Sequence, residues 1–196
     1  MHATVTVRPA VAGDWPAVAA IVNHYIATTT VNFRTEPQTA EDWAADWSSY
    51  RERFPWLVAA DGDTVLGVAY AAPWKARNAY DWCTEVTTYV DPESRGRRVG
   101  HEMYRRLLAI LDAQGFRTQM AVVGLPNPAS AGFHESFGFR RVGTLASVGY
   151  KHGRWCDIGF WQRVVGVPDE APGRLKPVDE VMKEVLDAVG RDGADT

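Results

Sequence analysis

One acidic side chain of this sequence stands where a carboxylate is not expected. Glu85 lies in the middle of residues 82–90, an alternating segment that is typical of a β-strand. Carboxylates are poor strand formers and are costly to bury without a partner. Glu85 is therefore either an edge or salt-bridged residue, or a partly desolvated carboxylate. In the second case its pKa is raised, as a general base near neutral pH requires.

A basic, glycine-containing loop follows that strand directly and opens a helix. Residues 95–100 read Arg-Gly-Arg-Arg-Val-Gly. Backbone N–H groups at a helix start, with the positive end of the helix dipole, suit a phosphate or a pyrophosphate, and three arginines add charge. The pattern is neither GxxxxGK[ST] nor GxGxxG, so it indicates neither a P-loop nor a dinucleotide fold. The alternative is a solvated basic turn that caps the helix.

The elements that must position these groups alternate between strands and helices. Hydrophobic periodicity, capping residues and turn signals predict an α/β chain with a mixed sheet, an antiparallel hairpin and one strand–loop–helix unit. Strands are expected over residues 4–8, 56–60, 64–71, 81–90, 118–123, 139–148 and 154–165. Helices are expected from Asp14, from Thr39 with an apolar stripe of Trp43, Trp47, Tyr50 and Phe54, from Gly100 to Gly115, and from Asn127 to Gly138.

Composition limits the kind of protein. The 196 residues carry 21 basic and 24 acidic side chains, a net charge of −3, which suits one compact domain and argues against a nucleic-acid partner. No apolar run is long enough for a membrane span, and the first residues lack the pattern of a signal peptide. Cys83 and Cys156 form no disulfide framework, and no metal site is expected. A reducing cytoplasm is the expected location.

The chain changes character after residue 165. Residues 4–165 are expected to form one domain, and residues 166–177 are rich in proline, glycine and charge, as in a linker. Residues 178–189 can form one amphipathic helix with Val181, Val185, Ala188 and Val189 on a side. The tail (166–196) carries no chemical motif. Its helix docks on the domain, docks on a partner subunit, or frays.

Several blocks resemble a known family. The loop at 95–100 resembles the acetyl-CoA pyrophosphate loop of the GCN5-related N-acetyltransferases (GNAT), and residues 127–139 resemble that family's final helix and strand. Arg98 departs from the pattern, because the family usually has glycine there. The arginine needs no glycine conformation while its φ is negative, and its side chain can reach a phosphate instead. Blocks at residues 21–26, 30–38, 55–59, 73–82, 124–127 and 151–162 are similar to the phosphinothricin N-acetyltransferases of that family and cover about residues 5–165 in order.

This resemblance implies a GNAT acyl-CoA N-acyltransferase fold and acetyl transfer from acetyl-CoA to an amine. Glu85 aligns with the family's proposed base, and His134 would protonate the leaving thiolate as an acid near neutrality. Backbone N–H groups near Tyr89 and Val90 would hold the thioester carbonyl oxygen. Residues implied in acetyl-CoA binding are Thr88, Tyr89, Val90, Arg95, Gly96, Arg97, Arg98, Val99, Gly100, His101 and Asn127.

The resemblance also assigns an acceptor site for phosphinothricin, a glutamate-like amino acid with a carboxylate and a phosphinate. Lys75 and Arg77 lie two apart, so on an extended chain they point the same way and would hold the acid groups. Tyr80 belongs to the same block, and Phe33 is assigned to the cleft wall. Without the resemblance, Lys75 and Arg77 read as a basic surface loop.

Other functions remain open at this point. In one alternative, the acceptor is methionine sulfoximine, methionine sulfone or another small amino acid. In others the chain is a non-catalytic acyl-CoA-binding regulatory domain or a structural oligomer module. The resemblance implies a homodimer with a small-molecule amino-acid substrate and neither nucleic acid nor membrane as a partner.

Overall fold

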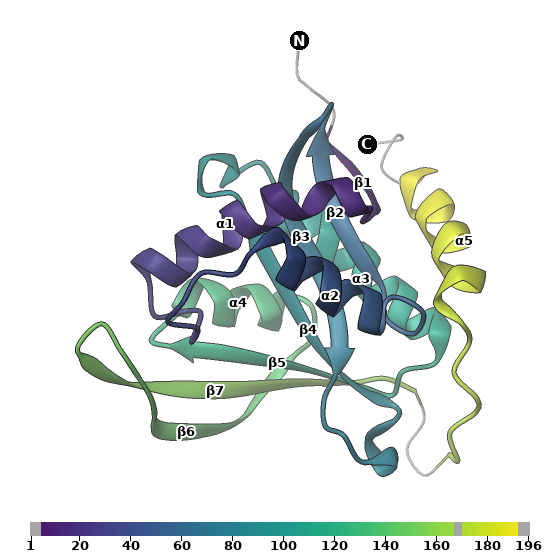
Figure 1. Cartoon of the computed structure of the whole chain (residues 1–196). Coiled ribbons are helices and arrows are strands. Elements are labelled where there is room, and N and C mark those ends of the chain that lie inside the picture. Colours follow the sequence, from purple (N-terminus) through teal and green to yellow (C-terminus); the bar gives the residue numbers. More distant parts are fainter. Residues whose placement is uncertain (1–4, 167–169, 192–196) are drawn as a thin grey trace.

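A computed structural model describes residues 5–166 and 170–191 of the chain (Figure 1). In this described part, one seven-stranded sheet has the order β1-β2-β3-β4-β5-β7-β6, with only β4 and β5 parallel. The expected α/β class with a mixed, mostly antiparallel sheet is confirmed. The strands are β1 (Thr6–Pro9), β2 (Trp56–Asp61), β3 (Thr64–Pro73), β4 (Cys83–Val90), β5 (Thr118–Leu125), β6 (Arg140–Lys151) and β7 (Arg154–Val164). The α-helices are α1 (Trp15–Thr28), α2 (Ala40–Tyr50), α3 (Val99–Gln114), α4 (Pro128–Ser136) and α5 (Val178–Arg191).

Local signals set several of these boundaries. The Thr39 hydroxyl accepts a hydrogen bond from the Asp42 N–H at 3.1 Å, and the Asp42 carboxylate accepts one from the Thr39 N–H at 2.8 Å. This reciprocal pair caps the start of α2, as the sequence predicts. Gly115 ends α3 with φ 97°, and Gly62 turns the β2–β3 hairpin with φ 58°. Both are left-handed conformations that glycine adopts without strain.

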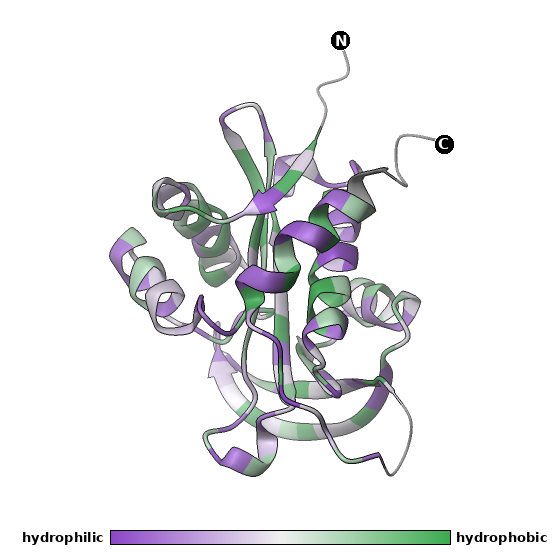
Figure 2. Ribbon diagram, turned by 90° about the vertical axis from the view of Figure 1, so that its right-hand side faces the viewer, coloured by the Kyte–Doolittle hydropathy of each residue, from purple (hydrophilic) through white to green (hydrophobic). Residues whose placement is uncertain are grey.

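Helices cover both faces of the sheet (Figure 2). α1 and α2 pack on one face around Trp15, Trp43 and Trp56, and α3 packs on the other with Leu107 at its centre. The predicted stripe of four aromatics is only partly right. Trp43 is buried, but α2 ends at Tyr50, which stays exposed. Phe54 lies beyond the helix and joins the core on the α3 side, because the chain crosses the sheet edge there.

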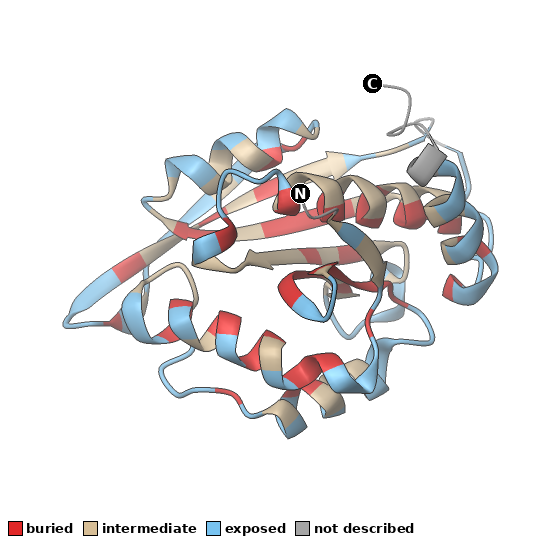
Figure 3. Cartoon of the chain, turned by 90° about the horizontal axis from the view of Figure 1, so that it is seen from above, coloured by how far each residue is buried: buried red, intermediate tan, exposed pale blue. Residues whose placement is uncertain are grey.

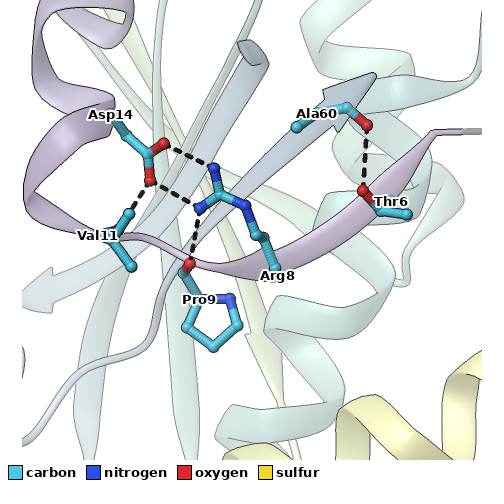
Figure 4. Close-up of polar contacts among 6 residues, drawn as sticks. All are labelled: Thr6, Arg8, Pro9, Val11, Asp14 and Ala60. Atoms are coloured by element: carbon cyan, nitrogen blue, oxygen red, sulfur yellow. Dashed lines mark hydrogen bonds and ion pairs between the residues drawn. The ribbon is translucent and has the colours of Figure 1, made fainter. Parts of the chain in front are cut away.

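A buried carboxylate joins β1 to α1 (Figure 4). Asp14 accepts two hydrogen bonds from the Arg8 guanidinium, at 2.7 and 2.9 Å, and one from the Val11 N–H at 2.8 Å. Burial by itself raises the pKa of the Asp14 carboxyl, but the bonds from Arg8 and Val11 outweigh it and hold the pKa below its usual value. The cluster fixes the direction in which α1 leaves the sheet edge.

The two parallel strands, β4 and β5, are paired along only part of their length. β4 and β5 pair only from Cys83–Thr118 to Glu85–Met120, although β4 runs on to Val90 and β5 to Leu125. Beyond the Glu85–Met120 pair, the β4 edge that faces β5 has no ladder partner. Unpaired backbone groups in such a gap are available to a ligand.

The C-terminal segment lies on the domain. α5 packs against α3 and buries Val178 and Val181. The segment predicted as a linker is held as well, since the Trp82 indole N–H donates to the Gly173 carbonyl at 2.8 Å and the Lys176 N–H to the Gln114 carbonyl at 2.9 Å. Of the alternatives for this helix, the structure shows docking on the domain. The predicted apolar position 189 lies outside the described side chains.

The β6–β7 hairpin extends away from the helices (Figure 1), and its outer end is largely exposed in Figure 3. It carries large apolar side chains in contact with solvent, namely Leu145, Val148, Tyr150 and Trp155. Within the described ranges, no helix is long and apolar enough to cross a membrane.

Candidate active site

A cleft of about 580 Å³ opens where β4 and β5 separate. Its walls come from the end of β4, the loop after it, the first turn of α3, the middle of β5 and the start of α4. These segments are far apart in sequence and meet only because the two strands diverge. The predicted site residues that line the cleft are Thr88, Tyr89, Val90, Arg95, Gly96, Arg98, Val99, Gly100, His101, Asn127 and His134.

The first turn of α3 forms one end of the cleft and is suited to an anion. Val99, Gly100 and His101 are the first residues of the helix, so their backbone N–H groups have no partner within it. A Cβ on Gly100 would lie 3.1 Å from the Val90 Cγ2 atom, tighter than ordinary contact. Gly100 therefore keeps α3 close to the end of β4, where the cleft is narrow.

Arg98 adopts a conformation that the sequence analysis did not expect. Its φ is +59°, in the left-handed region, so the condition under which the position would not need a glycine conformation is not met. The turn from the loop into α3 needs this conformation, which explains why glycine suits the position. The described residues provide no hydrogen bond, ion pair or ring contact for the Arg98 guanidinium, which lies at the cleft.

The other two arginines of the loop already have partners. The Arg95 guanidinium lies 5.7 Å from the centroid of the Tyr25 ring and donates to the Tyr25 hydroxyl at 3.4 Å, at the cleft wall. Arg97 pairs with Asp61 on β2 at 3.0 Å and does not line the cleft. We therefore assign Arg97 to holding the loop rather than to the ligand.

Backbone direction selects one of the two N–H groups expected at the reacting carbonyl. The Asp91 N–H donates to the Leu66 carbonyl of β3, and the β3–β4 register is regular. Every second residue of β4, counting back from Asp91 and therefore including Tyr89, directs its N–H group toward β3. Thr88 and Val90 direct theirs toward the gap. The Val90 carbonyl there accepts a hydrogen bond from the Tyr25 hydroxyl at 2.6 Å, which leaves its N–H for a ligand.

Glu85 lies at the last paired position of β4, where the gap begins. It does not line the cleft itself, and its side chain is on the face of β4 that also bears Tyr89. Burial raises the pKa of the Glu85 carboxyl above its usual value, and the nearby Lys75 ammonium opposes this to a smaller extent. Of the two interpretations of Glu85, the geometry favours the partly desolvated carboxylate.

His134 is buried at the opposite wall, on α4. Its Nδ1 atom lies 2.8 Å from the Tyr104 hydroxyl of α3. Burial lowers the pKa of the His134 imidazole to about 4, so the ring is neutral at pH 7. The expectation of a cationic acid near neutral pH therefore does not fit this environment. Asn127, at the start of the same helix, accepts a hydrogen bond from the Ser130 N–H at 3.1 Å and caps α4.

The loop between α1 and α2 forms the side of the molecule that carries Phe33, the predicted cleft wall. The Phe33 ring of that loop packs closely against Gly124 on β5 and Gly149 on β6. A Cβ added to Gly124 would lie 3.2 Å from the ring, and one added to Gly149 would lie 2.4 Å from it. Next to it, the Asn32 side chain donates to the Tyr89 hydroxyl at 2.9 Å. Lys151, a buried lysine, donates to the Asn32 carbonyl at 2.7 Å.

The predicted acceptor cations lie in a loop between β3 and β4. The Lys75 ammonium lies 4.6 Å from the centroid of the Trp74 ring and acts on the charge of Glu85. Arg77 precedes a short 3-10 turn that contains Tyr80, and both side chains are exposed. The structure brings Lys75 to Glu85 but does not bring Arg77 or Tyr80 to the cleft.

Sequence reasoning missed Asn32 and Lys151 as parts of this side. Asn32 stands in the block at residues 30–38 and Lys151 opens the block at 151–162, but their contact spans 119 positions. No local pattern reports such a pair. Among the described residues, no three His, Cys, Asp or Glu side chains are grouped so that they could hold a metal ion.

A mixed sheet whose parallel strands separate beside an anion-binding helix start defines a class of enzyme, the acyltransferases of the GNAT fold. Comparison with known proteins agrees. The model of the acetyltransferase (GNAT) family matches residues 18–139. The chain belongs to this family and is an acetyltransferase.

The relatives of this chain indicate which acetyltransferases it resembles. A phosphinothricin N-acetyltransferase of Streptomyces viridochromogenes is 51% identical over 178 residues, 90% of this chain and 96% of that protein. An L-methionine sulfoximine/L-methionine sulfone acetyltransferase of Pseudomonas aeruginosa is 32% identical over 170 residues, 85% and 98% of the two chains. A GNAT superfamily phosphinothricin acetyltransferase from Sinorhizobium meliloti, solved in complex with acetyl-CoA, has a TM-score of 0.82 at 32% identity and covers 87% of this chain and 94% of its own. The resemblance to phosphinothricin N-acetyltransferases is confirmed.

Proposed function

We propose that this enzyme transfers an acetyl group from acetyl-CoA to the free amine of phosphinothricin or a close glutamate-like amino acid. The observation that carries the proposal is the place of Glu85. It is a carboxylate with a raised pKa at the point where β4 and β5 separate, and it is close enough to Lys75 to interact with its charge. The Streptomyces viridochromogenes relative, at 51% identity, supports the choice of acceptor.

The cleft fits acetyl-CoA at its anion-binding end. The free N–H groups of the first turn of α3, with the Arg98 and Arg95 guanidinium groups, suit the pyrophosphate. The unpaired edge of β4 suits an extended arm with amide groups, which would continue the ladder that β5 leaves open. The neighbour from Sinorhizobium meliloti, solved with acetyl-CoA, supports this reading of the cleft.

Chemistry at the gap needs a base and a polarised carbonyl. Glu85 accepts a proton from the acceptor amine, which is mostly protonated at pH 7 when free in solution. The Val90 N–H, directed into the gap, stabilises the oxygen that becomes negative during transfer. Neutral His134 faces the other side of the cleft, where the sulfur leaves.

Transfer is direct rather than through an acetylated cysteine. Cys83 lies on the same face of β4 as Glu85, two positions before it, and is the described thiol nearest to the base. Burial, with a smaller contribution from Glu85, raises the pKa of the Cys83 thiol to about 11. At neutral pH it is therefore a thiol, not the thiolate that a nucleophile requires.

The acceptor is held by charge on one side and an aromatic wall on the other. Lys75, near Glu85, provides a cation for an acid group of the substrate, and Arg77 in the same loop provides a second. Phe33 forms the wall, fixed by its contacts with Gly124 and Gly149. Tyr80 lies in the same loop as the two cations. The proposed acceptor is a small amino acid with a second acid group, bound between this loop and the Phe33 ring.

A second acceptor class has its own support. The Pseudomonas aeruginosa relative acts, by its name, on L-methionine sulfoximine and L-methionine sulfone. These are amino acids with a polar, uncharged side-chain end, for which one cation near Glu85 would be enough. Phosphinothricin instead uses both Lys75 and Arg77.

One assay tests the proposal. Free thiol released from acetyl-CoA is measured with phosphinothricin, methionine sulfoximine, methionine sulfone and glutamate as acceptors. We expect the highest kcat/KM with phosphinothricin, and Arg77→Ala is expected to reduce it more than the value for methionine sulfone. Acetyl-CoA binding without thiol release from any acceptor would instead indicate a regulatory acyl-CoA-binding domain.

We also propose that two copies associate through the outer end of the β6–β7 hairpin. Tyr150 and Trp155 are 60% and 65% exposed and lie 5.4 Å apart between ring centroids, and Leu145 and Val148 are exposed on the same hairpin. Exposed apolar side chains that gather in this way mark an interface. Light scattering is expected to give the mass of a dimer for the full chain and of a monomer for Trp155→Asp.

A further inference from the structure

A buried tyrosine stands behind His134, and no chemistry has been assigned to it. Tyr104 is on α3, is fully buried, and does not line the cleft. Its hydroxyl lies 2.8 Å from His134 Nδ1, and that nitrogen is its one hydrogen-bond partner among the described residues. Phe133, Phe137 and Phe139 surround the pair with ring centroids 4.9 to 6.0 Å from that of Tyr104.

We propose that Tyr104 is a positioning residue that holds His134 in the tautomer with hydrogen on Nε2. The hydroxyl hydrogen and the Nδ1 lone pair are both buried, and each is satisfied only if Tyr104 donates to Nδ1. The reverse arrangement would leave the hydroxyl hydrogen without a partner among apolar rings. The proposal rests on the proposed function of the cleft.

The direction of the bond determines what His134 can do. Nδ1 faces Tyr104, so Nε2 is the ring nitrogen left for the cleft that His134 lines. Nε2 carries hydrogen and cannot accept a proton, so His134 is not an alternative base. It instead donates a hydrogen bond to the sulfur as negative charge develops there.

The proton balance is simple. The amide C–N bond forms as the thioester C–S bond breaks. The ammonium form of the acceptor loses two protons: one goes to water before attack, and the second goes to Glu85 as the amide forms. The sulfur takes one proton from water on release, and Glu85 returns its proton to solvent, so one proton is released per turnover. His134 and Tyr104 keep their protons throughout. Burial raises the pKa of Tyr104 well above its usual value, with Arg163 of β7 opposing this weakly, and lowers that of His134, so both stay neutral near pH 7.

The tautomer can be measured without turnover. The full chain, labelled with ¹⁵N-histidine, is studied by long-range ¹H–¹⁵N correlation, and His134→Gln assigns its signals among the five histidines. We expect a neutral ring with hydrogen on Nε2 from pH 8 down to pH 5.5. Hydrogen on Nδ1, or a cationic ring at pH 7, would overturn the proposal.

Tyr104→Phe removes the hydroxyl and keeps the ring. We expect both tautomers in the spectrum and a kcat reduced about fivefold to tenfold, with KM for both substrates nearly unchanged. Phe139→Leu is the matched control, since it alters packing 5.5 Å from the imidazole centroid and leaves the hydroxyl in place. It is expected to keep the tautomer.

The outcomes separate this inference from the proposed function. An unchanged tautomer or an unchanged kcat in Tyr104→Phe refutes the role of Tyr104, even if the wild-type enzyme acetylates phosphinothricin. A wild-type enzyme that releases no thiol with any acceptor refutes the proposed function, while the spectrum still reports the tautomer.

Discussion

Glu85→Gln tests the base and the cost of its charge in one variant. The substitution is nearly isosteric and removes only the ability to accept a proton and to ionise. Glu85 lies at the final β4–β5 pair, so its backbone is held on both sides and the strand should keep its course. Binding of acetyl-CoA, which we propose involves the first turn of α3, should be unchanged.

The expected loss of turnover follows from the general-base role. A positioned base contributes about 10²- to 10⁴-fold, so kcat at pH 7 should fall within that range. Because the pKa of Glu85 is raised by burial, the wild-type rate should rise with pH through an apparent pKa above that of a free glutamate. The deficit of the variant should shrink at alkaline pH, where the acceptor amine is already deprotonated.

The same raised pKa predicts an opposite effect on stability. A carboxyl whose pKa is higher in the folded state binds more protons there, so its contribution to stability falls as pH rises through that pKa. Above its folded-state pKa, wild-type Glu85 carries a partly desolvated charge, and glutamine avoids this cost. Glu85→Gln should therefore unfold at a higher temperature than wild type above that pKa, and the difference should shrink as pH falls through it.

Stopped-flow or endpoint thiol release gives kcat across pH 6–10, and thermal unfolding followed by circular dichroism gives the stability. A near-normal kcat at pH 7 together with a lowered unfolding temperature would refute the reasoning. Glu85 would then be a structural carboxylate paired with Lys75. Asp46→Asn, on α2 of the same half of the molecule, serves as a control for the loss of one negative charge.

Three further substitutions probe other parts of the structure. Gly100→Val places side-chain atoms against Val90, so KM for acetyl-CoA should rise at least tenfold with little change in acceptor KM, as steady-state kinetics will show. Arg98→Gly relieves a left-handed arginine, so the protein should be more stable by up to about 1 kcal/mol in urea unfolding, while acetyl-CoA binding weakens and depends less on salt. Asp14→Ala should cost about 2 kcal/mol of stability at pH 7, because it removes the acceptor for hydrogen bonds from Arg8 and the Val11 N–H. Since the pKa of Asp14 is lowered in the folded protein, its stabilisation is present above the pKa of an unfolded aspartate and is lost as pH falls through the folded value.

Local chemistry made much of the fold predictable from the sequence. The Thr39–Asp42 pair caps a helix that begins at the residue after Thr39, and Gly115 ends a helix that directly precedes it. Each depends only on residues close to it in the chain, so the sequence pattern predicts it directly. The same holds for Glu85, whose exceptional place in an alternating segment is visible without a structure. These features depend on near neighbours in the chain.

Features that depend on distant neighbours were not predictable. The left-handed φ of Arg98 is set by how α3 packs against β4, and the side chain gives no sign of it. The neutral state of His134 follows from burial between α3, α4 and β6, and its partner Tyr104 is 30 positions away. Arg97 reads as a phosphate ligand until Asp61 is seen beside it.

The hydrogen bond from the Trp82 indole to the Gly173 carbonyl joins residues 91 positions apart. Trp82 follows the loop that carries Lys75 and Arg77, and the Arg53 guanidinium holds the preceding Asp81 carbonyl at 2.7 Å. The C-terminal segment thus supports the loop that we propose binds the acceptor. Substitutions in the C-terminal segment can therefore change acceptor preference. Mutant libraries restricted to cleft residues would miss such substitutions, and a reporter protein fused near the C-terminal segment could change acceptor preference.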